Sequence, residues 1–166
     1  MTLCVKCAQY ETTCCQACKI FVTDGDIQRI RDHVGHADFW EYSDPGDPDM
    51  VKPQPQDPNW LLYTLRPDGT RPHLKQRLSG SCTFLSSSGC VLPSGVRPLI
   101  CRLYPYDYTE DGITRTVTGC PIYLLEKGQN IIDGLGMKHA DAERWRAQLY
   151  HELRSGSVYD ENRHHV

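Results

Sequence analysis

Apolar residues recur at helical spacing in one stretch of the first quarter of the chain: Ile27, Ile30 and Val34. Thr23 precedes this stretch as a typical N-cap, and Asp26 stands three residues further on as its capping-box partner. Gly35 follows the last apolar position, where a C-cap glycine belongs. The pattern therefore predicts a helix over residues 24–34, and we expect a further helical turn at residues 37–42.

A second helical pattern lies near the C-terminus, where three large apolar residues share one face: Trp145, Leu149 and Leu153. Gly156 follows them, so the predicted helix covers about residues 140–154. Residues 160–166 lack such a pattern, and we expect them to be frayed. At the other end of the chain we expect residues 1–18 to form a loop, which residues 20–22 either continue or end as a short strand.

Two turns that contain Asp-Gly are each flanked by short strand-like runs. The runs and the turns are, in chain order, 60–65, 66–70 and 73–78, then 106–108, 110–112 and 113–117. An Asp-Gly turn between two such runs is typical of a β-hairpin. The sequence therefore predicts two hairpins, which lie before and after a segment that is rich in cysteine.

Five prolines interrupt the stretch 44–58: Pro45, Pro48, Pro53, Pro55 and Pro58. Proline fixes its own backbone angle and lacks an N–H, so this stretch is predicted to be a surface loop without a regular element. With 166 residues the chain is predicted to form a single domain, residues 1–166. The expected fold class is a small, irregular and loop-rich α+β fold with short hairpins and two main helices.

Composition indicates a modest apolar core, because only 39% of the residues are hydrophobic while the chain contains 11 Pro and 13 Gly. A net charge of −3 provides no broad basic surface for nucleic acid. No apolar run is long enough to span a bilayer, and residues 1–10 lack the pattern of a signal peptide. We therefore expect a cytoplasmic location, where disulfides are disfavoured.

The nine cysteines fall into an early set and a late set: Cys4, Cys7, Cys14, Cys15 and Cys18, then Cys82, Cys90, Cys101 and Cys120. The Cys-x-x-Cys spacing occurs twice in the early set, and it lets two thiolates face one ion. The late cysteines lie beside Gly or Pro, in loops that can bend around an ion. Because an odd count also argues against a closed disulfide framework, the cysteines predict one or two zinc or iron–sulfur sites that stabilise the fold.

Two divisions of these ligands are consistent with the sequence. In the simpler one, Cys4, Cys7, Cys15 and Cys18 form one site, the four late cysteines form the other, and Cys14 is left over. In the second, Cys14 and Cys15 serve different sites because the side chains of adjacent residues diverge, and both sets contribute to both sites. The ferredoxin spacing and the paired zinc-finger spacing with histidines are both absent, so we expect mainly thiolate ligation.

Around the late cysteines the chain reads Gly80-Ser81-Cys82-Thr83-Phe84-Leu85, then Gly89-Cys90, then Arg97-Pro98-Leu99-Ile100-Cys101-Arg102-Leu103-Tyr104-Pro105. This run resembles the Cys-x-Phe-Leu … Cys … Arg-Pro-x-x-Cys-Arg-x-x-Pro hallmark of the YkgJ-type cysteine-cluster family, which is described as a zinc- or iron-chelating domain. The vicinal pair Cys14-Cys15 and the late Cys120 also resemble the family's pattern. The resemblance covers roughly residues 4–35 and 80–121.

The resemblance implies metal binding, and it places Arg97 and Arg102 within the hallmark as candidate cofactor-binding residues. A cation beside a thiolate cluster offsets the charge of that cluster, and we favour this structural role. In the alternative, Arg102 binds an anionic substrate or a partner.

Two features depart from the family's pattern. The gap between Cys7 and Cys14 is longer, and Cys18 is an additional cysteine. These departures leave the ligand set of the early cysteines open, with either Cys4 or Cys18 as the spare one. A related cysteine cluster occurs in flagellin lysine N-methylases, where it is thought to be iron–sulfur, but this chain is short for a full enzyme of that kind.

Three functional hypotheses follow. The favoured one is a metal-binding protein that holds zinc or iron, including a 4Fe-4S cluster, through cysteine thiolates. The alternatives are an iron–sulfur oxidoreductase or protein-modifying enzyme related to the lysine N-methylases, and a metal carrier or sensor. Metal ions are the expected partners and a protein partner is left open, whereas no nucleic acid or membrane is expected. No nucleophile–base pair or phosphate-binding loop is recognisable, so no catalytic residue is assigned.

Overall fold

Short helices and two-stranded sheets alternate along the chain in the computed structural model, which describes residues 1–10, 13–116 and 119–164, apart from the side chain of Ala17. The α-helices in these residues are α1 Leu3–Tyr10, α2 Cys14–Ala17, α3 Asp24–Val34, α4 Trp60–Thr64, α5 Leu99–Leu103, α6 Ile131–Leu135, α7 His139–Arg154 and α8 Ser157–His164. The strands are β1 Trp40–Ser43, β2 Arg71–Leu74, β3 Leu85–Ser86, β4 Gly89–Cys90, β5 Tyr106–Thr109 and β6 Gly112–Thr116. They pair as β1–β2, β3–β4 and β5–β6, all antiparallel, so the fold is a small α+β fold.

Helix α3 confirms the prediction for residues 24–34. The hydroxyl of Thr23 accepts the N–H of Asp26 at 2.9 Å, and the Asp26 carboxylate accepts the N–H of Thr23 at 3.1 Å. Gly35 ends the helix in the left-handed conformation, with φ of 81°. The expected helical turn at residues 37–42 is wrong, because Trp40–Ser43 is the strand β1, which pairs with β2.

Helix α7 confirms the C-terminal prediction and buries Leu149 and Leu153 on one face. The residues from 160 to 164 are not frayed but belong to α8, while residues 165–166 lie outside the described part. The side-chain amide of Asn162 donates hydrogen bonds of 2.8 Å to the carbonyl oxygens of Leu62 and Leu65. These bonds fasten α8 to the segment around α4, a contact between distant parts of the chain that local sequence patterns do not reveal.

The hairpin predicted around residues 110–112 is confirmed by β5 and β6, although position 117 of its second run lies outside the described residues. The other predicted hairpin is wrong. Its turn forms, with the N–H of Arg66 bonded to the carbonyl oxygen of Thr70 at 2.9 Å, but α4 precedes the turn and β2 pairs with β1 instead. The apolar run in α4 packs against α7 and α8, because tertiary burial there favours a helix over a strand.

Residues 1–18 are not the predicted loop, because they contain α1 and α2. At the start of α2 the side chain of Gln16 accepts the N–H of Thr13 at 2.7 Å, which is one half of a capping box. The proline-rich stretch 44–58 is irregular as predicted, apart from one 3₁₀ turn at Pro48–Val51. In residues 20–22, the backbone of Phe21 forms an isolated bridge to His73 on β2.

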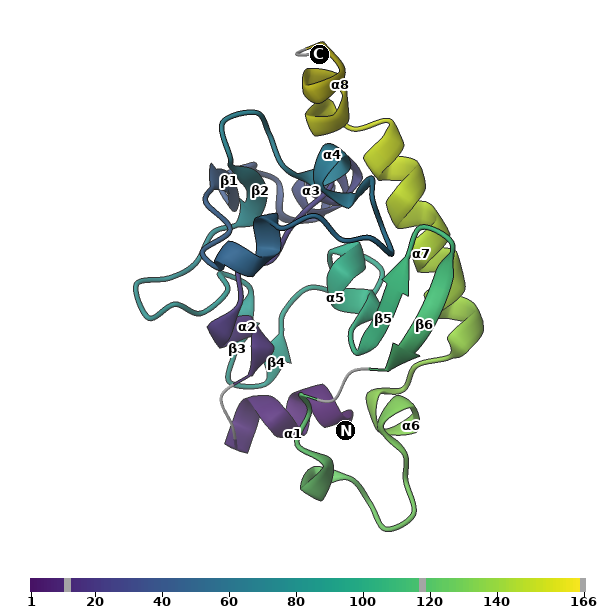
Figure 1. The fold of residues 1–166 in the computed structure, drawn as a ribbon. Coiled ribbons are helices and arrows are strands. Elements are labelled where there is room, and N and C mark those ends of the chain that lie inside the picture. Colours follow the sequence, from purple (N-terminus) through teal and green to yellow (C-terminus); the bar gives the residue numbers. More distant parts are fainter. Residues whose placement is uncertain (11–12, 117–118, 165–166) are drawn as a thin grey trace.

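Two apolar clusters form the core. One cluster gathers residues between positions 20 and 92, and it includes Ile20, Val22, Ile27, Ile30, Phe39, Leu74, Cys82, Phe84, Leu85 and Leu92. The other joins α5, β5 and α7 through Leu99, Leu103, Tyr106, Leu149, Tyr150 and Leu153. Figure 1 shows α7 along one side of the molecule, with α5 and the β5–β6 hairpin beside it.

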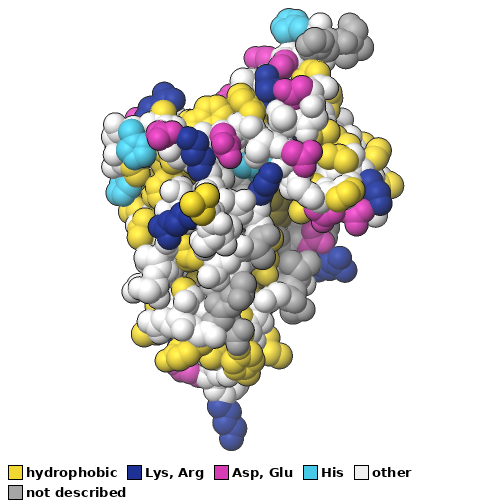
Figure 2. All heavy atoms as spheres, turned by 90° about the vertical axis from the view of Figure 1, so that its left-hand side faces the viewer, with side chains coloured by type: hydrophobic (Ala, Val, Ile, Leu, Met, Phe, Trp, Pro, Cys, Tyr) yellow, Lys and Arg dark blue, Asp and Glu magenta, His cyan; other side chains and the backbone are white. Residues whose placement is uncertain are grey.

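Helix α1 lies at the lower end of the molecule in Figure 1, and it contacts β4, the 3₁₀ turn η2 (Ile122–Leu124) and α6. Figure 2 shows that charged side chains gather in the upper half of the face turned to the viewer, while apolar side chains form a band near the lower end, below which one basic side chain projects. None of the helices in the described residues is both long and apolar enough to cross a membrane.

Candidate metal centre

Four cysteines from separate segments meet at the first apolar cluster, and we call them the inner group: Cys15, Cys82, Cys90 and Cys101. Cys82 belongs to the buried cluster itself, with 6% of its surface exposed, and the other three pack against that cluster. The backbone holds these segments together. The N–H of Cys82 donates to the carbonyl oxygen of Cys15 at 2.7 Å, and Cys90 pairs with Leu85 in the β3–β4 sheet.

The thiols of the inner group lie near enough to influence one another's ionisation. Burial raises the pKa of Cys101 well above its usual value, and the thiols of Cys15, Cys82 and Cys90 raise it further. Burial also raises the pKa of Cys82 to about 11, with added contributions from Cys15 and Cys90. Four thiols that oppose each other's negative charge in an apolar surrounding are a fitting donor set for a cation that binds sulfur.

The remaining cysteines near this site lie towards the surface, and we call them the outer group: Cys4, Cys7, Cys14 and Cys120. Cys4 is exposed as a whole residue, but burial of its sulfur is the main cause that raises its pKa to about 11. Cys120, Cys15 and Cys7 raise that pKa further. The pKa of Cys120 is raised by burial and by Cys7, although a hydrogen bond from the Tyr104 hydroxyl opposes this effect.

The vicinal pair Cys14-Cys15 is where the two groups meet. A hydrogen bond with the Cys14 thiol is the main cause that raises the pKa of Cys15, so these adjacent side chains do not diverge completely. Cys15 acts on the inner thiols and also on Cys4 of the outer group, whereas Cys14 acts on Tyr104. Each of the two groups thus contains cysteines from both the early and the late set. Cys18 is exposed and belongs to neither group.

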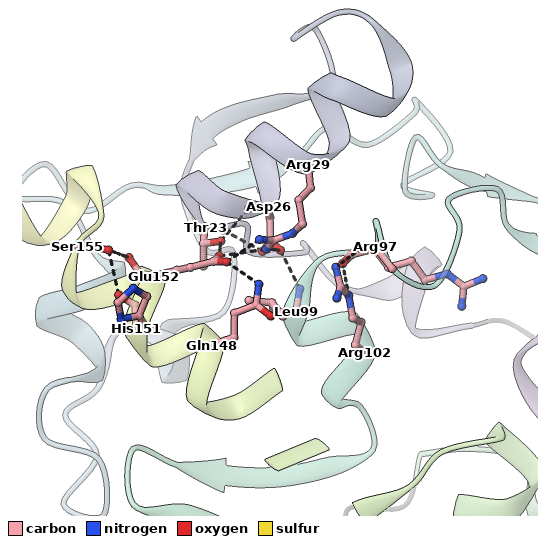
Figure 3. Close-up of polar contacts among 11 residues, drawn as sticks. Thr23, Asp26, Arg29, Arg97, Leu99, Arg102, Gln148, His151, Glu152 and Ser155 are labelled. Atoms are coloured by element: carbon pink, nitrogen blue, oxygen red, sulfur yellow. Dashed lines mark hydrogen bonds and ion pairs between the residues drawn. The ribbon is translucent and has the colours of Figure 1, made fainter. Parts of the chain in front are cut away.

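The two arginines of the hallmark have different surroundings. Arg97 donates to the carbonyl oxygens of Leu92 at 2.9 Å and of Cys90 at 3.5 Å, and its charge lowers the pKa of thiols in both groups, including those of Cys4 and Cys15. Arg102 donates to the carbonyl oxygen of Arg97 at 2.7 Å (Figure 3). Arg97 is therefore one cation beside the cysteines, and Arg77 likewise opposes the burial that raises the pKa of Cys82. Arg102, whose pKa is lowered by burial although Cys101 opposes this effect, braces the loop that carries Arg97.

A buried polar network fixes the helix that carries Cys101 (Figure 3). The carboxylate of Asp26 is fully buried and accepts the N–H of Leu99, at the start of α5, at 3.0 Å. Arg29 links this carboxylate to Glu152 on α7, with distances of 2.6 Å from its nitrogens to an oxygen of each acid. The capping box revealed Asp26 from the sequence, but no local signal indicated its contact with Leu99 or the part played by Glu152.

All nine cysteines are present as thiols. As the side chains stand, no three His, Cys, Asp or Glu side chains within residues 1–10, 13–116 and 119–164 form a group that could hold a metal ion. A metal would therefore have to draw the thiols closer together. The donor chemistry fits, because soft thiolates select zinc or iron–sulfur clusters, and the structure supplies a nearby cation, Arg97, to offset their charge.

Comparison with known proteins adds no relative: no family model matches this chain, and no curated protein or solved structure is similar to it. The interpretation of the site therefore depends on the residues and contacts described above.

Proposed function

We propose that this chain is a metal-binding protein whose inner group holds a zinc ion or an iron–sulfur cluster that stabilises the fold. One observation carries the proposal. Cys15, Cys82, Cys90 and Cys101 come from four separate segments, yet all four contact the same apolar cluster as thiols and not as disulfides. Buried thiols that only filled space would not need three further thiols as neighbours.

The energetic argument concerns the loops between these cysteines. Residues 76–103 contain three of the four inner thiols, and their regular structure consists of the two-residue strands β3 and β4, one isolated bridge between Gln76 and Cys82 and the short helix α5. An ion bound by all four thiolates would tie this stretch to α2, and its binding free energy would add to the free energy of folding. Four thiolates around Zn²⁺ carry a net charge of −2, which the guanidinium of Arg97 would partly offset.

The sequence resemblance supports the same proposal independently of the structure. Cys82, Cys90 and Cys101 stand at the three cysteine positions of the hallmark of the YkgJ-type family, and Arg97 stands at its first arginine. The fourth ligand that we propose, Cys15, belongs to the vicinal pair that the family also has. The inner group is thus the part of the cysteine constellation that most resembles a known pattern.

The test is purification of the full chain without oxygen, followed by metal analysis and an ultraviolet–visible spectrum. We expect bound metal, and we expect Cys101→Ser to lose it and to unfold at a clearly lower temperature. Cys18→Ser is the matched control, because Cys18 is exposed and outside both groups. A protein that folds equally well without metal, or a Cys101→Ser variant that behaves like Cys18→Ser, would contradict the proposal.

The spectrum also separates the two kinds of metal. A colourless protein that contains zinc would assign a structural ion with closed four-coordinate geometry. A brown protein that contains iron and acid-labile sulfide would assign a cluster, and an iron–sulfur enzyme would then become the favoured class.

A further inference from the structure

Two inner cysteines, Cys15 and Cys82, lie on segments whose backbones touch. The N–H of Cys82 donates to the carbonyl oxygen of Cys15 at 2.7 Å. A Cβ atom added at Gly80 would lie 3.6 Å from the carbonyl oxygen of Gln16, so the same two segments also approach each other beside this bond. Residues 14–16 and 80–82 are therefore neighbours in the fold, although they are far apart in the sequence.

The backbone bond limits how far apart the two α-carbons can be. The α-carbon of Cys15 lies about 2.4 Å from its own carbonyl oxygen, and that of Cys82 lies about 1.5 Å from its own nitrogen. With 2.7 Å between that oxygen and that nitrogen, the α-carbons of Cys15 and Cys82 are at most about 6.6 Å apart. Disulfides join α-carbons up to about 6.8 Å apart, so a bridge between these residues needs no separation of the two segments.

The two side chains also share their surroundings. Cys82 is a buried member of the first apolar cluster, and Cys15 packs against that cluster. The backbone of Cys82 is fixed on its other side, because it bridges Gln76 and its carbonyl oxygen accepts the N–H of Leu85 at 3.0 Å. Cys15 is only half-buried, so a small reagent has access to it. An accessible thiol beside a protected one is the arrangement of an attacking and a resolving cysteine.

We propose that Cys15 and Cys82 form a reversible disulfide under oxidising conditions, and that this disulfide opens the inner site. The disulfide itself depends on the contacts above, whereas its effect on a bound ion rests on the proposed function. With glutathione disulfide as the oxidant, the Cys15 thiolate attacks one sulfur and releases one glutathione. The Cys82 thiolate then displaces the second glutathione from the mixed disulfide. The two protein thiols are oxidised, and their two protons pass to the two glutathione thiolates that leave.

The disulfide would control the inner site because it consumes two of its four proposed ligands. A sulfur atom in a disulfide has no thiolate charge with which to bind an ion. Cys90 and Cys101 remain, and two thiolates do not complete the four-coordinate geometry of a structural zinc site. Because the two segments stay together, reduction restores both ligands in place. The inner group thus keeps its ion while its thiols are reduced and releases the ion when they are oxidised.

The first test equilibrates the full chain, without metal, in buffers with increasing ratios of glutathione disulfide to glutathione. Free thiols are then blocked with iodoacetamide, and linked peptides are identified by mass spectrometry without reduction, with fragmentation to distinguish Cys15 from Cys14. We expect a link between Cys15 and Cys82 in the wild-type chain. Cys82→Ser should abolish this link and Cys18→Ser should keep it. A link from Cys15 or Cys82 to any other cysteine, or no link within the chain, would overturn the inference.

The second test adds Zn²⁺ and follows its release with the chromogenic chelator 4-(2-pyridylazo)resorcinol. At a given glutathione ratio, we expect bound Zn²⁺ to lower the linked fraction at least about ten-fold, and we expect dithiothreitol to restore binding to the oxidised chain. Cys90→Ser should lose the ion and keep the disulfide, because Cys90 is outside the pair.

The outcomes separate this inference from the proposed function. A chain that binds no Zn²⁺ but links Cys15 to Cys82 would overturn the proposed function and the control of the site, while the disulfide stands. A chain that binds Zn²⁺ but never forms the link would overturn this inference alone. Equal Zn²⁺ affinities of the oxidised and reduced chains would show that the disulfide does not open the site.

Discussion

Asp26 provides the sharpest test of how the polar network supports the inner group. Its carboxylate is fully buried and accepts three hydrogen bonds: from the N–H of Thr23 at 3.1 Å, from the N–H of Leu99 at 3.0 Å and from the guanidinium of Arg29 at 2.6 Å. The substitution Asp26→Asn keeps the size of the side chain but leaves only one acceptor oxygen. At least one buried N–H then faces the new amide N–H₂ group and loses its partner.

The expected loss can be worked out from these contacts. A buried N–H without a partner costs about 1–3 kcal/mol, and the hydrogen bond to charged Arg29 contributes a similar amount. Arg29 keeps its contacts with Glu152, so its charge is not left unpaired. We therefore expect Asp26→Asn to lower the free energy of unfolding by about 2–5 kcal/mol, a large share of the 5–15 kcal/mol typical of a small domain.

The assay is urea unfolding followed by circular dichroism, with wild type and variant in the same metal state. Asp32→Asn is the matched control on the same helix, because Asp32 is exposed and its carboxylate accepts a hydrogen bond of 2.7 Å from the side-chain amide of Gln28. That control should change stability by less than about 0.5 kcal/mol. Burial raises the pKa of Asp26, against the hydrogen bonds from Thr23 and Arg29. An Asp26→Asn variant as stable as the control would show that the buried acid is neutral, and the ionic account of the network would be refuted.

Three further predictions concern other parts of the molecule. Burial and two neighbouring basic side chains lower the pKa of His73 to about 4, so the folded chain keeps this ring neutral while the unfolded chain protonates it near pH 6.5. The free energy of unfolding should therefore fall by up to about 3 kcal/mol as the pH drops from 6.5 to 4. In urea unfolding of the metal-free proteins, His73→Gln should lose less stability than wild type over that pH range. Arg97→Gln should weaken Zn²⁺ binding about ten-fold in chelator competition, whereas Arg97→Lys, which keeps the charge, should retain most of the affinity. Equal affinities for wild type and Arg97→Gln would contradict the role of this cation. Gly119→Ala, where an added Cβ would lie 2.6 Å from the Tyr104 oxygen, should displace Tyr104 and lower the unfolding temperature, while Gly95→Ala, where an added Cβ meets nothing within 4 Å, should leave the unfolding temperature unchanged.

Local signals in the sequence predicted those elements that depend on neighbouring residues. The capping box of Thr23 and Asp26 and the glycine at position 35 defined α3, and the Asp-Gly turn at residues 110–112 defined the β5–β6 hairpin. The same kind of turn at residues 66–70 misled the prediction for the preceding run. There the partner of β2 is β1, which lies about thirty residues earlier and leaves no mark on the turn.

The candidate site was predictable in composition but not in arrangement. Cysteine spacing indicated metal chemistry, and the sequence left two divisions of the ligands open. The structure brings Cys15 to the late cysteines and brings Cys120 to the early ones, through contacts between segments more than sixty residues apart. Spacing along the chain carries no information about such contacts. Glu152, which fastens the network from α7, could not be found from sequence because it lies in an ordinary amphipathic helix.

The vicinal cysteines couple the position of one thiol to the position of the other. Cys14 and Cys15 belong to different groups but share one peptide bond, so placing one thiol also places the backbone of the other. Cys15 packs against the first apolar cluster, and this packing also holds Cys14 in place beside Tyr104. A change that displaces Cys15 from the cluster should therefore also disturb the surroundings of Tyr104, although the two residues lie in different segments of the chain.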